Sequence, residues 1–348
     1  MSMNRMGELG MTETDGASVQ SDGSLPVFPF FVGCGRSGTT LVREIFRAHP
    51  ELAIPPESHF LSRMVQRERK GDGPVGFSAE RFLSELLGGP WLSRWELSKE
   101  DVSKAVLDPP PSGLADAVRR VFALYARLSG KPRYGDKTPR YVLHITQLAN
   151  LFPEARFVHI IRDGRDVTMS QMEKSWGANN AVEGALIWTE RVMAGRQAGR
   201  MLGPTRYHEI QYERLLDDPE GVARSLCEFI DVQFDPTMLR YYEQRRVARP
   251  ARERRTGRRM GRLHLPPTKG LRDWRRQMSK GDIAAFESIG GDLLQDLGYE
   301  RGIERLPAWR RLFVRVRVFT SRSLFAARRL ARRARAKARV RPRTRTAG

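Results

Sequence analysis

The residues best suited to chemistry in this chain form a short glycine-containing segment after an apolar run. Residues 28–33 are almost entirely apolar, Gly33 and Gly38 are spaced as in a phosphate-binding loop, and Thr40 stands where that pattern has its Ser or Thr. Apolar residues at helical spacing follow, so backbone N–H groups at a helix N-terminus are expected to bind an anion there. Thr39 replaces the lysine that contacts the β- and γ-phosphates of a nucleoside triphosphate. The segment therefore predicts a phosphate site without the usual triphosphate chemistry.

A second apolar strand is followed by polar residues of the same kind. Residues 156–161 predict this strand, Arg162 stands at its end, and Ser170 lies eight residues later on the helix expected next. A third short strand, 207–210, precedes Tyr212. The second strand and the helix start after it are of the kind that forms ligand crevices in open α/β sheets.

These segments resemble motifs of sulfotransferases that use 3′-phosphoadenosine-5′-phosphosulfate (PAPS). The first loop is similar to the one that holds the 5′-phosphosulfate, and the second strand and helix are similar to the 3′-phosphate motif. Two later segments also match. The segment that begins at Tyr212 is similar to the family segment whose tyrosine lies by the adenine, and the segment that begins at Lys269 is similar to the family loop that closes over the 3′-phosphate. The four motifs follow family order over roughly residues 28 to 300. The resemblance assigns nucleotide binding to Gly35, Arg36, Ser37, Gly38, Thr39, Thr40, Arg162, Ser170, Tyr212, Lys269 and Gly270.

The resemblance also implies three catalytic residues. Glu57 follows a Pro-Pro turn and resembles the catalytic glutamate of tyrosylprotein sulfotransferases, which makes it the expected general base. Lys137 resembles a lysine that contacts the transferring sulfonate, and Arg36 would neutralise the oxygen between sulfur and phosphorus. His59 is the alternative base, since histidine has this role in cytosolic sulfotransferases. Glu57 could also be a carboxylate that complements a helix dipole, and Lys137 an exposed turn lysine.

The function expected from this resemblance is transfer of a sulfuryl group from PAPS to an acceptor hydroxyl or amine. The reaction would be a metal-independent in-line displacement, in which positioning and charge stabilisation dominate. The partner would be a hydroxyl-bearing glycan, lipid, peptide or small molecule. One rival function is a P-loop kinase or NTPase, which Thr39 and the lack of a convincing Walker-B aspartate disfavour. Another is a non-catalytic nucleotide or polyanion binder, which Glu57 and Lys137 beside both phosphate motifs disfavour.

The elements that position these residues predict one α/β domain with a P-loop-like parallel sheet flanked by helices. Residues 59–130 are expected to be mainly helical, either as an insertion that shapes the acceptor pocket or as an ordinary packing layer. The segment from Tyr134 to Pro139 predicts a turn. A disordered leader is expected at 1–26, the sulfotransferase domain at 27–300 and a basic tail at 301–348.

Composition limits the setting of the chain. Two cysteines cannot form a disulfide framework, and the N-terminal segment lacks the apolar region of a signal peptide, so a cytoplasmic location is expected. No Cys/His cluster has metal-ligand spacing, which agrees with a reaction that needs no metal.

The positive charge is concentrated in the tail. Residues 301–348 hold seventeen Lys or Arg against one acidic residue, Glu304, so the tail carries +16 of the formal +21. The tail has three functional interpretations. It could form a basic amphipathic helix peripheral to the anionic inner membrane surface, it could bind an acidic acceptor polymer, or it could bind nucleic acid. No nucleic-acid recognition motif accompanies the tail. A solvated tail is the fourth interpretation and is favoured slightly over membrane contact.

Overall fold

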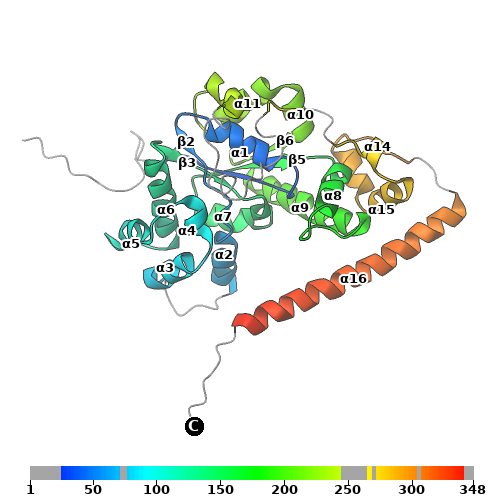
Figure 1. Ribbon diagram of the computed structural model, residues 1–348, viewed down its shortest axis with the longest axis horizontal. Coiled ribbons are helices and arrows are strands. Elements are labelled where there is room, and N and C mark those ends of the chain that lie inside the picture. Colours follow the sequence, from blue (N-terminus) through cyan, green and yellow to red (C-terminus); the bar gives the residue numbers. More distant parts are fainter. Residues whose placement is uncertain (1–24, 71–76, 244–264, 269–271, 304–306, 341–348) are drawn as a thin grey trace, which may run out of the picture.

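A small parallel sheet forms the centre of the computed structural model (Figure 1), which describes residues 25–70, 77–243, 265–268, 272–303 and 307–340. Its strand order is β4-β1-β5-β6, and every neighbouring pair is parallel. The four strands are β1 (Phe28–Gly33), β4 (Asp136–Lys137), β5 (Ala155–Ile161) and β6 (Tyr207–Gln211). Helices flank this sheet, which confirms the predicted α/β class.

The edge strand β4 corrects one prediction. Asp136 and Lys137 were expected in a turn, but they pair in parallel with Phe30 and Phe31 of β1. Gly135 and Pro139 on either side are turn-forming residues, so the two-residue strand has no sequence signal of its own. A second sheet pairs β2 (Leu52–Ala53) with β3 (Arg133–Tyr134) and leads the chain into β4.

Alternate side chains of the strands pack on opposite faces of the sheet. On one face, Phe28 and Phe30 join a cluster with Phe122 and Phe152, while on the other face Phe31 packs in a second cluster with residues of α1 and α11. The helices that follow strands or cover these faces are α1 (Thr39–Arg47), η1 (Pro139–His144), α7 (Ile145–Leu151), α8 (Gly164–Met172), α9 (Ala181–Leu202), α10 (Tyr212–Asp217), α11 (Pro219–Phe229) and η2 (Pro236–Arg240).

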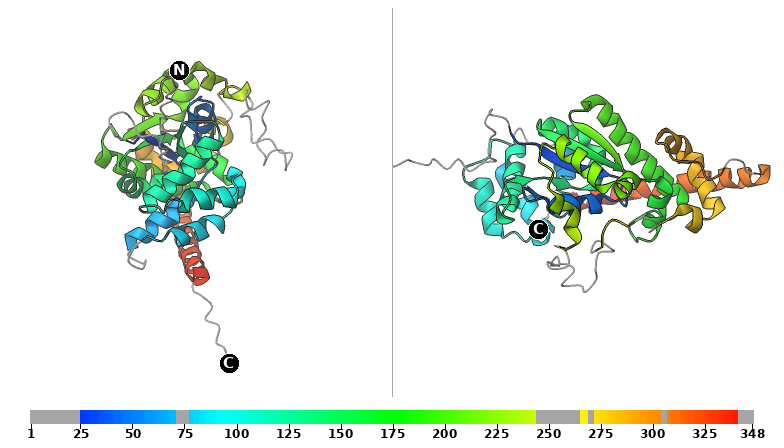
Figure 2. Two further views of the ribbon diagram at one scale, coloured as in Figure 1. Left: turned by 90° about the vertical axis from the view of Figure 1, so that its left-hand side faces the viewer. Right: turned by 90° about the horizontal axis from the view of Figure 1, so that it is seen from above.

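The region expected to be mainly helical is so in its described part. It forms α2 (Leu61–Lys70), α3 (Ala79–Leu87), α4 (Trp91–Trp95), α5 (Lys99–Leu107) and α6 (Leu114–Leu128). These helices gather at one end of the sheet (Figures 1 and 2). The apolar stripe of α6 is buried at Val118, Val121 and Phe122, so this helix fixes the layer to the strands.

Helices α14 (Trp274–Gln277) and α15 (Lys280–Asp296) lie at the other end of the sheet, and α16 (Ala308–Val340) extends from that end along the domain (Figure 1). A third apolar cluster joins α8, α9 and α15 around Trp188 and Phe286. Helix α16 contacts α9 and α15 and extends along one side of the molecule (Figure 1). Among the described helices, none has the length and apolar character needed to cross a membrane.

Candidate active site

The phosphate loop runs from the end of β1 into the N-terminus of α1. Arg36 and Gly38 adopt left-handed backbone conformations, with φ of 82° and 88°, and Gly38 is the N-cap of α1. A Cβ at Gly38 would lie 2.1 Å from the ring of Tyr212, so this position requires glycine. The first turn of α1 carries no acidic residue, which leaves its N–H groups and positive dipole end available to an anion.

The two predicted phosphate motifs meet directly. Arg36 Nε donates a hydrogen bond of 2.9 Å to the hydroxyl of Ser170 on α8, a residue 134 positions later in the chain. The neighbouring Gln171 donates from Nε2 to the carbonyl oxygen of Gly35 at 3.1 Å. Helix α8 is therefore fixed against the loop by two polar contacts.

Three arginines contribute positive charge around this junction. Partial burial of Arg36, and then the charges of Arg272 and Arg162, lower the pKa of its guanidinium. Arg162 donates to Asp166 at 2.9 Å, and its buried Nε has no hydrogen-bond partner among the described residues. Arg272 makes two bonds of 2.5 and 2.6 Å to Glu173. The arginines thus outnumber the carboxylates that they contact.

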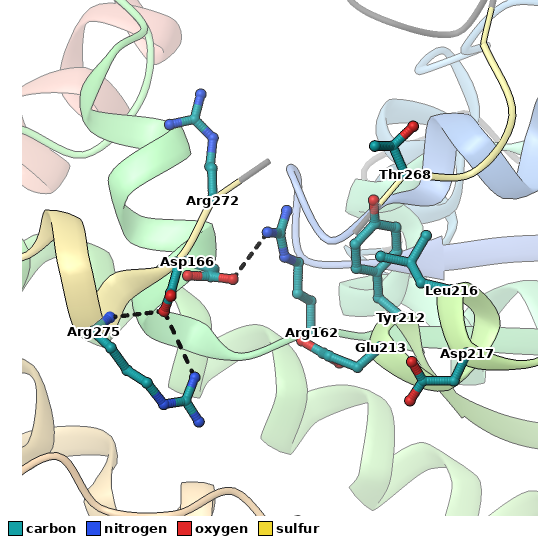
Figure 3. A pocket seen from close by; sticks show the side chains of 10 residues that line it. Arg162, Asp166, Tyr212, Glu213, Leu216, Asp217, Thr268, Arg272 and Arg275 are labelled. Carbon is teal, nitrogen blue, oxygen red and sulfur yellow. Dashed lines mark hydrogen bonds and ion pairs between the residues drawn. The ribbon is translucent and has the colours of Figure 1, made fainter. Parts of the chain in front are cut away.

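A pocket of about 260 Å³ opens beside these arginines (Figure 3). In the close-up, the guanidinium of Arg162 lies between Asp166 and the ring of Tyr212, and it is 4.8 Å from the centre of that ring. The lining residues are Arg162, Asp166, Tyr212, Glu213, Leu216, Asp217, Thr268, Arg272, Asp273 and Arg275. The lining thus holds one aromatic ring, three arginines and four carboxylates, and the ring and the arginines are the groups suited to a phosphorylated ring compound.

The predicted catalytic pair is also in contact. Lys137 Nζ, on β4, donates to Glu57 Oε1 at 2.6 Å, and His59 Nε2 lies 2.9 Å from Glu57 Oε2. Burial raises the pKa of Glu57, but the hydrogen bond from His59 and the charge and hydrogen bond of Lys137 outweigh burial and hold the pKa at about 2. Glu57 is therefore ionised at neutral pH, and both its oxygens have a donor.

A buried polar network positions this pair, and sequence reasoning missed it. The Ser58 hydroxyl donates to Asp136 at 2.7 Å and contacts the Tyr141 hydroxyl at 2.6 Å, while the Ser58 N–H donates to Thr138 at 3.0 Å. Burial raises the pKa of Asp136 to about 6 against the hydrogen bonds from Ser58 and Thr138. Because Ser58 follows Glu57 and Asp136 precedes Lys137, the network holds the two catalytic candidates together.

Two predicted nucleotide-binding residues are not described, and two side chains near the pocket are buried in the domain. Lys269 and Gly270 lie outside the described residues. Trp274 is buried, with the guanidinium of Arg165 3.4 Å from its ring centre, and Arg165 is fully buried between Asp163 and Glu287. Both therefore pack inside the domain. Among the residues that the structure describes, no group of three or more His, Cys, Asp or Glu is arranged to hold a metal ion.

Comparison with known proteins identifies the family. A family model described as the sulfotransferase family matches residues 29–236, which include the loop, α8 and the Glu57–Lys137 pair. The chain belongs to the sulfotransferase family. Membership supports sulfuryl transfer in general, and the predicted resemblance to sulfotransferases is confirmed.

Individual relatives of this sulfotransferase are distant. It is 25% identical over 230 residues to an uncharacterized protein of Aquifex aeolicus, covering 64% of this chain but 28% of that protein. It is 26% identical over 224 residues to a putative protein-tyrosine sulfotransferase of Caenorhabditis briggsae, covering 62% of this chain and 69% of that protein. The sulfotransferase domain of the Synechococcus PCC 7002 olefin synthase shares the fold, with a TM-score of 0.54, 24% identity, and coverage of 81% of this chain and 96% of that domain.

Proposed function

We propose that this sulfotransferase transfers the sulfuryl group of PAPS to a hydroxyl (or amine) acceptor without a metal ion, using Glu57 as the general base. The 2.9 Å bond between Arg36 and Ser170 carries the proposal, because it joins the two motifs expected to bind the two phosphorylated ends of the nucleotide. The adjacent ion pair of Glu57 and Lys137 supplies a proton acceptor and a cation in the same site.

The loop and the start of α8 carry the donors needed to bind the two phosphorylated ends of PAPS. The loop backbone from Gly35 to Thr40, with the hydroxyls of Thr39 and Thr40, would hold the 5′-phosphate at the N-terminus of α1. Arg162 and Ser170 would hold the 3′-phosphate, and the Nε of Arg162, which has no partner among the described residues, is the donor that such an anion would satisfy.

Side chains around the pocket would complete this nucleotide site. Arg272 and Lys269–Gly270 would add positive charge and N–H groups at the 3′-phosphate. Tyr212 lies on the pocket wall with its ring against Gly38 and would contact the adenine.

PAPS supplies an activated sulfuryl group, so the protein has to position the acceptor and stabilise charge. The bond from sulfur to the phosphate oxygen breaks as the bond from sulfur to the acceptor oxygen forms, and the acceptor proton passes to the Glu57 carboxylate. Arg36 balances charge on the released phosphate, and Lys137 balances charge on the sulfuryl oxygens. Because the leaving phosphate needs no proton, a second acid is not required.

The contacts of Glu57 also identify an alternative general base. With a pKa of about 2, Glu57 is a weak base that would accept the proton late in the displacement, after an acceptor hydroxyl has replaced one of its two donors. His59 bonds to the same carboxylate at 2.9 Å and would take the proton if Glu57 only orients its ring. Comparing the loss of turnover in the variants Glu57→Gln and His59→Asn separates these roles.

The acceptor is proposed as a class. The relatives named as protein-tyrosine sulfotransferases support a hydroxyl-bearing acceptor, and a glycan, lipid, peptide or small molecule all meet that chemistry. The ring centre of Trp91 lies 5.8 Å from that of His59, so an aromatic surface adjoins the alternative base.

The proposed function is tested by incubating the full-length protein with PAPS labelled in its sulfuryl group and a panel of phenols, tyrosine peptides and glycans, with a metal chelator present. We expect label transfer to at least one acceptor class and its loss in Glu57→Gln. Transfer of a phosphoryl group from ATP with Mg²⁺, in place of sulfuryl transfer, would contradict the proposal. Nucleotide binding without any turnover across the panel would favour the non-catalytic binder.

A further inference from the structure

Helix α16 (Ala308–Val340) is basic along its whole length and is held to the domain by one face. It contains twelve Lys or Arg and no Asp or Glu. Val314 is buried, Arg317 bonds to Asp282 of α15 at 2.5 Å, and Arg328 bonds to Glu183 of α9 at 2.7 Å. These contacts fix which face of the helix points toward the domain.

The opposite face presents an apolar stripe to solvent. Leu312, Val316, Phe319 and Leu330 are exposed by 64%, 55%, 73% and 65%. At about 100° of rotation per residue, these four positions lie within about 60° of one another, and Val314 lies roughly 160° from Leu312. Single exposed apolar residues are common on proteins, but a stripe along one helix face marks an interaction surface.

Arginines lie beside this stripe. Arg315 and Arg322 are exposed, and neither has an ion-pair partner within the described part of the chain. They lie about 60 to 80° around the helix from Leu312, at the border of the apolar stripe. Their guanidinium groups are therefore free to bind anions at the level where the apolar side chains would enter a non-aqueous phase.

We propose that the outer face of α16 binds the surface of an anionic lipid bilayer. A helix that combines an apolar stripe with bordering arginines lies in the interface plane, with apolar side chains among the acyl chains and cations at the headgroups. The interaction is peripheral, because α16 lacks the apolar length of a spanning helix. This interaction would place the enzyme at a membrane surface, and it does not depend on the sulfuryl-transfer chemistry.

The side chains disfavour two other partners. A second copy of α16 would cover the stripe, but it would bring two rows of arginines together without acidic partners on the helix. A nucleic acid or acidic polymer would neutralise the arginines, but it would leave Phe319 and Leu330 without an apolar environment. An anionic bilayer satisfies both features at once.

The test is flotation of the full-length protein with vesicles of mixed phosphatidylglycerol and phosphatidylcholine, compared with vesicles of phosphatidylcholine alone. We expect binding to the anionic vesicles, and a loss of at least about tenfold in the double variant Val316→Ser/Phe319→Ser, because both side chains lose their transfer into the acyl region. The variant Arg315→Gln/Arg322→Gln is expected to lose about tenfold or more and to depend less on salt.

The matched control is Leu128→Ser/Met201→Ser, which removes two apolar side chains exposed by 58% and 63% on α6 and α9. Its vesicle binding should equal that of the wild type, and circular dichroism should show all variants folded. Equal vesicle binding by Val316→Ser/Phe319→Ser and the wild type would overturn the proposal and leave a purely electrostatic polyanion surface. Failure of the wild-type protein to bind anionic vesicles would overturn it as well.

Discussion

The nucleotide side and the acceptor side of this site hold their charges differently. On the nucleotide side, Arg36 is bonded to the Ser170 hydroxyl, Arg162 and Arg272 are each bonded to one carboxylate, and the buried Nε of Arg162 has no hydrogen-bond partner among the described residues. On the acceptor side, one carboxylate is bonded to one lysine and one histidine. The first region thus keeps a donor that a phosphorylated ligand would bind, whereas in the second both carboxylate oxygens are already bonded to the protein's own lysine and histidine.

The two regions should therefore respond to different substitutions. Removing a cation from the nucleotide side is expected to weaken binding, because the ligand loses a partner. Altering the ion pair on the acceptor side is expected to change turnover, because the nucleotide does not depend on it. The following substitutions test this division.

The largest effect is expected for Glu57→Gln, which keeps the shape of the side chain but removes its charge. We expect kcat to fall by about 10²- to 10⁴-fold, because the amide cannot take the acceptor proton. The dissociation constant of 3′-phosphoadenosine-5′-phosphate (PAP), measured by calorimetry, should change by no more than about twofold. His59→Asn is the companion variant: a larger loss of turnover there than in Glu57→Gln would make His59 the base.

The next effect concerns Asp136, which is fully buried and whose pKa is raised from 3.8 to about 6. Between these pH values the folded state binds a proton that the unfolded state has released, so this group makes stability fall as pH rises from about 4 to 6. The loss is on the order of 3 kcal/mol. Thermal unfolding across this range should show a weaker decline in Asp136→Asn than in the wild type. Parallel pH profiles for the two proteins would contradict the buried, proton-binding state of Asp136.

Arg162→Ala should weaken the binding of PAP by roughly 10- to 100-fold, because a charge-assisted contact to the 3′-phosphate is lost. Its affinity for AMP, which lacks that phosphate, should change little. Arg224→Ala is the matched control, since Arg224 also pairs with an acidic residue on the same helix turn, Glu220, and packs on an aromatic ring, Phe234. An equal loss of PAP affinity in both variants would remove Arg162 from the binding site.

The smallest effect is expected at Tyr212. Tyr212→Leu should weaken PAP and AMP alike by about fivefold, because a base–aromatic contact contributes on the order of 1 kcal/mol. Tyr212→Phe keeps the ring and should bind both nucleotides as the wild type does. A phenylalanine variant as weak as the leucine variant would show that the hydroxyl acts in place of the ring.

Sequence patterns predicted the elements with strong local signals. Strand β1, the loop after it and the helix that contains Ser170 follow from apolar runs, glycine spacing and helical periodicity. The pairing of Arg36 with Ser170 could be expected only in general terms, because the carboxyl ends of neighbouring strands meet.

Long-range contacts could not be predicted in the same way. Strand β4 consists of two residues between turn formers and exists only because β1 pairs with it. The network of Ser58 with Asp136 and Tyr141 joins residues that are 78 and 83 positions apart in the sequence, and no local pattern encodes it. The close contact of Tyr212 with Gly38 likewise depends on the packing of α10 against the loop.

The assignment of this site to PAPS is tested most directly by calorimetric titration of the full-length protein with PAP, AMP and ATP in the absence of metal ions, followed by ATP with Mg²⁺. The buried Nε of Arg162, which has no hydrogen-bond partner among the described residues, predicts that PAP binds at least about 100-fold more tightly than AMP, since only PAP carries the 3′-phosphate. Equal affinity for PAP and AMP, or tighter binding of ATP with Mg²⁺ than of PAP, would contradict the assignment of this site to PAPS.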